Sequence, residues 1–302
     1  MAADRATGDD RRRAVASDRK HPSGEGIMPY RYAHRWLLLL FPLIALAFWP
    51  GYFGQLSEAP FALHAHGITA TAWLALLTLQ SWSISAHRIA LHRTSGLATF
   101  VVLPLFAAAG PLALHGMASL WRSNADPFHA TYGARLASVD MIAGAAVIAM
   151  VAYALAQRRR MAVHASAMLA TALLVLPPIL GRLLPAIPGF PVGGSAGFGG
   201  FRLSFHLANL LTLLIAASLA TRRPSRGIGF AFAAIATAAQ MIAFETIGGS
   251  DPWQRCVTVF TDLPPAPLAV AAAIANGALL WWAWRMVPPH VARHDHATAV
   301  DL

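Results

Sequence analysis

The sequence predicts an all-α membrane protein, a bundle of about eight transmembrane helices with both termini in the cytoplasm. Three observations carry this prediction. Of 302 residues, 57% are hydrophobic and 12% are charged, against about 25% charged in soluble domains. The apolar residues fall into eight runs, each near the ~20 residues that cross a bilayer. Lys and Arg cluster between alternate runs, as they do where positive charge sets the orientation in a membrane.

Two polar tails are expected to flank one transmembrane domain. Residues 1–30 read as a disordered basic tail without apolar periodicity, with Met28 as an alternative start, and residues 289–302 as a short cytoplasmic tail. The domain at 31–288 holds all the apolar runs. Its helices are expected at 36–53, 62–85, 94–117, 134–157, 162–184, 201–221, 227–247 and 267–287.

Local sequence sets the ends and bends of these helices. Pro50 and Gly51 close the first, and the aromatic side chains around them suit a membrane surface. We expect the third helix to bend at Gly110-Pro111 and the fifth at Pro177-Pro178, because proline removes a main-chain hydrogen bond. The fourth, seventh and eighth are rich in small residues, which lets neighbouring helices approach closely.

The distribution of positive charge sets the orientation and excludes one class of function. With the N-terminus inside, 18 of the 23 Lys and Arg residues fall on the inner side, so we place both termini in the cytoplasm of an inner membrane. The net charge of +10 therefore reflects topology. We expect the lipid bilayer as the partner, and no nucleic acid, since no folded basic surface is available. The single cysteine, Cys256, excludes an internal disulfide.

Five ionisable residues inside the apolar runs point to a functional site, because charge is expensive to bury in a bilayer. In the predicted topology all five lie in the outer half of the membrane, which favours one shared site. For any single residue there is a plainer explanation than a functional site. Arg182 would only form an ion pair, and a histidine would only contact lipid headgroups. The five are His64, His66, Asp140, His206 and Glu245, with His115, Arg182, Asn209 and Gln240 at similar depth.

Opposed histidines on neighbouring membrane helices are typical ligands of b-type haem. We expect His66, rather than His64, to face the bundle, since two residues on a helix are about 200° apart. His66 with His206 would then form an outer pair, and His92 with His164 an inner pair. Arg182 would bind a haem propionate, or Arg202 in its place. This hypothesis predicts electron transfer or redox sensing, with a quinone or a redox protein as partner.

Three other functions remain open from the sequence. A non-haem metal would take His66 and His206 with Asp140 or Glu245 as ligands, although the HxxxH and HExxH patterns are absent. A transporter or small-molecule-binding protein would use Asp140, Arg182, His206 and Glu245, helped by the proline breaks in its helices. An assembly or scaffold protein would need none of these side chains except for stability.

Two stretches carry a resemblance to other proteins. The second helix and the L-H-R-x-x-G turn after it resemble a broad set of uncharacterised bacterial polytopic inner-membrane proteins. More distantly, His92-x-x-x-Gly96 resembles the helix opening of cytochrome b561-like two-haem membrane cytochromes, which implies His92 as a haem ligand. The residues of the resemblance are His64-Ala65-His66, Trp73, Gln80, Arg88, Leu91-His92-Arg93 and Gly96, then His164, Met168, Ala170-Thr171, Pro177 and Arg182.

Overall fold

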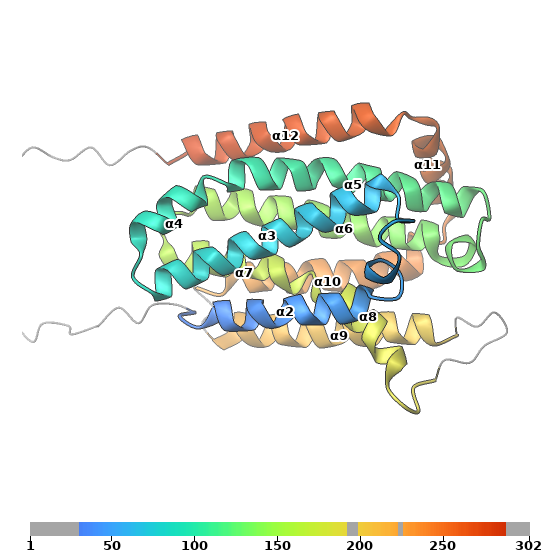
Figure 1. The fold of residues 1–302 in the computed structure, drawn as a ribbon, viewed down its shortest axis with the longest axis horizontal. Helices are drawn as coiled ribbons and strands as arrows, with labels where there is room; N and C mark the ends of the chain where they lie inside the picture. Colours follow the sequence, from blue (N-terminus) through green and yellow to red (C-terminus); the bar gives the residue numbers. More distant parts are fainter. Residues whose placement is uncertain (1–29, 192–198, 223–225, 288–302) are drawn as a thin grey trace, which may run out of the picture.

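The computed structural model describes residues 30–191, 199–222 and 226–287. Every regular element within these ranges is a helix, so the predicted all-α class is confirmed for them (Figure 1). The predicted tail at 289–302 lies outside the described residues, as does the tail at 1–30 except for its last residue.

Seven stretches of the described residues are long and apolar enough to cross a membrane. The helix predicted at 36–53 is the shorter α2, Ala33–Phe48, whose 16 residues rise only about 24 Å against a hydrocarbon core of ~30 Å. The count of eight crossings therefore stays a prediction. The seven are α3 (Phe61–Ser85), α5 (Thr99–Arg122), α6 (Pro127–Ala156), α7 and α8 together (Met161–Leu173 and Leu176–Leu183), α9 (Gly199–Arg222), α10 (Ile228–Thr246) and α12 (Pro265–Arg285).

Shorter helices change two predicted boundaries and one predicted loop. A separate helix, α4 (Ile89–Gly96), takes up the start of the helix expected at 94–117. The helix expected at 134–157 begins at Pro127, because Asp126 caps it by accepting a hydrogen bond from the main-chain nitrogen of His129 (2.9 Å). The outer segment between α10 and α12 contains α11 (Asp251–Asp262). Two 3₁₀ turns complete the elements, η1 (Phe53–Gln55) and η2 (Leu184–Ala186).

The predicted kink of the fifth crossing is confirmed as a break. α7 ends at Leu173, and α8 begins at Leu176, immediately before Pro177-Pro178. Proline supplies no main-chain donor, so the preceding turn loses its regular hydrogen bonds. α7 packs mainly on α6 and α10, whereas α8 packs mainly on α9 and α2. The break therefore lies where the chain changes helix neighbours.

The helices form one bundle with the two ends of the described chain at the same end (Figure 1). We call this the inner end, and the opposite end, where α11 lies, the outer end. α5 runs beside α12, and α9 beside α10, in the two most extensive helix pairings. α4 lies at the inner end, between α3 and α5.

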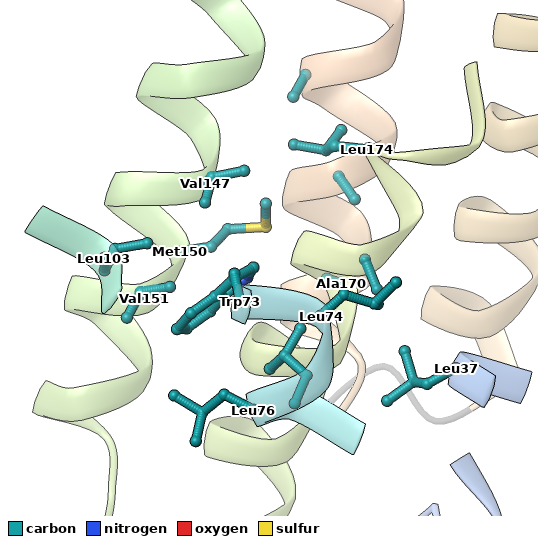
Figure 2. Packing of buried hydrophobic residues seen from close by; sticks show 14 of the residues in the cluster. Leu37, Trp73, Leu74, Leu76, Leu103, Val147, Met150, Val151, Ala170 and Leu174 are labelled. Atoms are coloured by element: carbon teal, nitrogen blue, oxygen red, sulfur yellow. The ribbon is translucent and has the colours of Figure 1, made fainter. Parts of the chain in front are cut away.

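Two packed regions lie at different depths in the bundle. The larger, which we call the inner core, surrounds Trp73 of α3, whose ring lies beside Met150 and Val151 of α6 (Figure 2). The indole nitrogen of Trp73 donates to Thr171 of α7 (3.1 Å), which satisfies the one polar atom of the ring. Toward the outer end lies the outer aromatic cluster, formed by Tyr132, Phe201, Phe205 and Phe244.

The closest helix contact in the inner half joins α7 and α10. Gly229 of α10 lies against the main chain of Ser166 and Ala167, where a β-carbon would overlap the backbone. The main-chain nitrogen of Gly229 donates to the Ser166 hydroxyl (3.4 Å), which is fully buried. Small residues on both helices allow this approach.

Candidate functional site

Asp140 lies between the inner core and the outer aromatic cluster, on the packed face of α6. The residues that share this face at helical spacing, Ala137, Val147 and Val151, are all buried. The Asp140 side chain is nevertheless exposed. An exposed side chain on a packed face indicates a local gap between the helices, which we call the recess. Met141, the next residue, is 51% exposed and faces outward.

Arg182 lies close enough to Asp140 for their charges to interact. It sits in the last turn of α8, and its side chain turns back along the helix, where Nη1 donates to the Pro178 carbonyl (3.0 Å). The guanidinium also lies over the ring of Phe48 on α2 (4.3 Å to the centroid). The charges of Arg182 and Asp140 interact, yet no ion pair within 4.0 Å joins them in the described structure.

Two glycines mark open space near these charges. Gly144 lies one turn from Asp140 on the same face of α6, and Gly181 precedes Arg182. A β-carbon built at either glycine would meet no atom within 4 Å, in contrast to the close packing at Gly229. Neither glycine therefore packs closely against a neighbouring helix.

Neighbouring helices also bring buried polar atoms that have no hydrogen-bond partner. The Gln240 amide of α10 donates to the Val139 carbonyl (3.3 Å), next to Asp140, and its oxygen is unpaired. On α9, Asn209 donates to Phe205 (2.9 Å), and its oxygen is likewise unpaired. An unpaired buried acceptor costs about 1–3 kcal/mol.

Glu245 belongs to a different group, at the outer end. Its carboxylate accepts two hydrogen bonds from Arg202 (2.8 and 2.5 Å) and one from Nε2 of His206 (2.6 Å). Nη1 of Arg135 donates to the Phe244 carbonyl (2.7 Å) at the same end of α10. We call these residues the ion-pair group, and they cover the outer aromatic cluster. Because the Glu245 carboxylate binds Nε2 of His206, that nitrogen is not free to coordinate a metal.

The two histidines of the second helix point to separate surroundings. Nδ1 of His64 is bonded to the Tyr52 hydroxyl (2.8 Å). His66 lies against Phe106 of α5 (5.5 Å between centroids), and its Nδ1 is buried without a partner. No contact joins His66 to His206 among the residues that the structure describes. The predicted outer constellation is thus distributed over the recess, the ion-pair group and the His64–Tyr52 contact.

The inner histidines lie near each other. His92 and His164 are close enough for their charges to interact. Nδ1 of His164 donates to the Ala154 carbonyl (2.8 Å). The Gln80 amide satisfies its neighbours when its nitrogen faces α4, where it donates to Nδ1 of His92 (2.7 Å) while its oxygen accepts from the Gly96 nitrogen (3.1 Å). In the neutral rings, Nε2 of His92 therefore carries the proton, because Nδ1 accepts from Gln80. In His164 the proton is on Nδ1, so Nε2 has the free lone pair.

Groups outside the membrane-spanning segments also have shifted pKa values. Burial lowers the pKa of His92, a main-chain hydrogen bond with Gln80 opposes this, and Arg93 lowers the pKa further. Burial lowers the pKa of Arg158, whose guanidinium donates to the carbonyls of Trp284 and Val287 (2.7 and 2.6 Å) at the end of α12. The inner end of the bundle is thus closed by an arginine that satisfies free helix carbonyls.

No group of three or more His, Cys, Asp or Glu side chains in the described ranges is arranged to hold a metal ion. The proposed set of His66, His206, Asp140 and Glu245 is therefore not gathered at one point. Comparison with known proteins gives no match: no family model, no curated protein and no solved structure is similar to this chain.

Proposed function

We propose that this protein is a multi-pass membrane transporter for a small polar solute, with Asp140 and Arg182 as its binding groups. The observation that carries the proposal is the state of Asp140. Its side chain lies on the packed face of a membrane-spanning helix, is exposed, and makes no hydrogen bond or ion pair with another described residue. Such a group is costly in a bilayer unless water, a proton or a solute meets it.

Two further features support transport. Arg182 lies on α8, the helix that follows the break in the fifth crossing. Interrupted helices are common at the binding sites of transporters, because the break leaves main-chain groups free to bind the solute. The recess also lies between two packed regions, the inner core and the outer aromatic cluster. Such an arrangement holds a solute away from both membrane surfaces, and loosening of one region at a time would give access from one side at a time.

Thiol labelling tests this proposal without knowledge of the solute. Cys256 is the single cysteine, so a Cys256→Ser chain accepts one reporter thiol. We expect Asp140→Cys in this background to react with a membrane-impermeant methanethiosulfonate from both sides of sealed vesicles. The matched control is Met141→Cys, which faces outward and should stay unlabelled. Labelling from one side only contradicts passage, and no labelling at position 140 contradicts an aqueous recess.

A second candidate is binding of b-type haem at the inner histidines, which would supply a one-electron redox centre to a quinone or a redox protein. The favouring observation is the Nδ1 hydrogen bond from His164 to a main-chain carbonyl, which leaves Nε2 free in the way usual for ligating histidines. His92 is not arranged as a haem ligand, because Gln80 donates to its Nδ1. The proton is then on Nε2, which has no lone pair for iron. In the outer pair, His206 is bonded to Glu245 through Nε2.

The absorbance spectrum of the purified protein, oxidised and then reduced with dithionite, tests the second candidate. Sharp reduced bands that His164→Ala abolishes would support it. Their absence from protein purified out of haem-supplemented cells would contradict it.

A further inference from the structure

Contacts at the outer end fix how α9 and α10 face each other. The rings of Phe205 and Phe244 stack at 4.2 Å between centroids. The residues that follow them in sequence, His206 and Glu245, are bonded through Nε2 and a carboxylate oxygen (2.6 Å). The two helices run in opposite directions and pack extensively on each other (Figure 1). A residue four positions after Phe205 and a residue four positions before Phe244 therefore lie one turn further inward, at the same level of the interface.

The residues at these two positions are both amides, Asn209 and Gln240. Three residues further inward on the same faces are Thr212 and Thr237, which again lie at one level. Spacing of four and then three residues keeps side chains on one face of a helix, here the face that begins at the stacked rings. All four side chains are at most 3% exposed. We call these four residues, which form two polar layers between α9 and α10, the polar quartet.

Each side chain of the polar quartet donates a hydrogen bond to a main-chain carbonyl. The amide nitrogen of Asn209 donates within α9 (2.9 Å), and that of Gln240 donates to the Val139 carbonyl of α6 (3.3 Å). The hydroxyl groups of Thr212 and Thr237 donate to the carbonyls one turn before them (2.9 and 2.8 Å). Because a carbonyl only accepts, these bonds also fix which end of each amide is the nitrogen and which is the oxygen.

The atoms that remain unused are oxygens. The amide oxygens of Asn209 and Gln240 are buried without a partner, and each threonine hydroxyl oxygen retains a lone pair. Neutral carbonyl oxygens replace the hydration shell of alkali ions in channels, whereas sites for divalent ions are built around carboxylates. The polar quartet contains no carboxylate, so an ion with a single positive charge fits it best.

We propose that the polar quartet binds one alkali-metal cation between α9 and α10. Asn209 and Gln240 would supply amide oxygens from facing helices, and the hydroxyl oxygens of Thr212 and Thr237 would complete the site from its inner side. A bound ion would join the two helices in the middle of the bundle, where no side chain of one bonds to the other within the quartet. The site contains neither Asp140 nor Arg182, so the inference does not depend on the proposed transport function.

Thermal unfolding of the detergent-purified full chain tests this inference. The midpoint is measured in NaCl, in KCl and in choline chloride at equal ionic strength, and then as a function of the alkali-ion concentration. A ligand that binds only the folded protein raises the midpoint as its concentration increases. We expect an alkali salt to raise the midpoint above that in choline chloride, because choline is too large to enter a buried group of oxygens.

Three variants assign the effect to the polar quartet. Thr237→Val keeps the shape of the side chain and removes one oxygen, so the ion concentration for half of the rise should increase about tenfold, as for the loss of one charged contact. Gln240→Met, of similar length and without the amide, should abolish the rise. The matched control is Thr78→Val on α3, which loses a hydroxyl bonded in the same way to the carbonyl one turn before it (2.8 Å). It should respond as the original protein does.

Each result decides the inference. A rise that Thr237→Val shifts and Thr78→Val leaves unchanged supports it. Equal midpoints in the three salts overturn it, and leave water as the partner of the two amide oxygens. A rise that every variant shares also overturns it, since it marks a general effect of salt. If Thr237→Val does not fold, Thr212→Val removes the matching oxygen from the facing helix and is judged by the same outcomes.

Discussion

Two glycines on neighbouring helices offer a test of where the bundle is packed and where it is open. Gly229 contacts the main chain of α7, and Gly144 lies beside the recess with no atom within 4 Å of a built β-carbon. The same change, glycine to alanine, adds one methyl group at each. The structure predicts opposite effects on the free energy of unfolding.

The magnitudes follow from two contributions. Alanine in place of glycine inside a helix stabilises by about 1 kcal/mol through backbone entropy. At Gly144 nothing opposes this gain, so we expect Gly144→Ala to stabilise by ~0.5–1 kcal/mol. At Gly229 the methyl group overlaps the backbone of Ser166 and Ala167, and overpacking against main-chain atoms, which cannot move aside, costs about 2–3 kcal/mol, the upper part of the usual range. We expect Gly229→Ala to destabilise by a net ~1–2 kcal/mol.

Thermal unfolding of the detergent-purified variants measures the difference. About 2 °C per kcal/mol is expected for a chain of this size, so the two midpoints should separate by roughly 3–6 °C on the same scale, with the original protein between them. Gly229→Ser, which adds a hydroxyl to the same clash, should be no better than alanine. Equal midpoints for Gly144→Ala and Gly229→Ala would refute the contrast between a packed interface and an open recess.

Three further predictions concern other parts of the fold. The main-chain hydrogen bond from His129 lowers the pKa of Asp126, so the stabilisation by this cap is complete above the ordinary carboxyl range and is lost as the pH falls through the lowered pKa. In Asp126→Asn the thermal midpoint should therefore fall less steeply with decreasing pH below about pH 4. Trp73→Phe should cost ~1–2 kcal/mol through the lost bond to Thr171, and its effect should be less than additive with Thr171→Val in thermal unfolding. Phe244→Ala removes a fully buried ring and should cost ~3–5 kcal/mol, seen as a lower unfolding midpoint.

Much of the fold follows from short-range properties of the sequence. Hydropathy located all seven long crossings, because a lipid-exposed helix must be apolar over its whole length. The break before Pro177-Pro178 was predictable for the same local reason, the missing proline donor. Helix starts were harder. α6 begins at Pro127 because of the Asp126 cap, a signal that was present in Asp126-Pro127-x-His129 but lies in a polar stretch that hydropathy assigns to a loop.

The candidate site was predicted only in part, because depth along a helix does not specify which way a side chain faces. Asp140 and Arg182 were expected in one site, and in the structure their charges interact without an ion pair within 4.0 Å. Glu245 and His206, at similar predicted depth, face each other at the outer end instead. Arg202, assigned only to a possible propionate, completes that group. The open space at Gly144 had no signal in the sequence, since Gly229, the same residue type in another helix, is closely packed.

The break between α7 and α8 gives the two charges different mechanical supports. Asp140 is carried by α6, which packs with α7 and α10, whereas Arg182 is carried by α8, which packs with α9 and α2. The segment around Leu174 and Val175 joins these two helices. Because α9 also packs extensively on α10, the supports of the two charges are tied together through that pairing. A change in the packing of α9 on α10 would therefore move the Arg182 side chain relative to the Asp140 side chain without any change within α6 or α8.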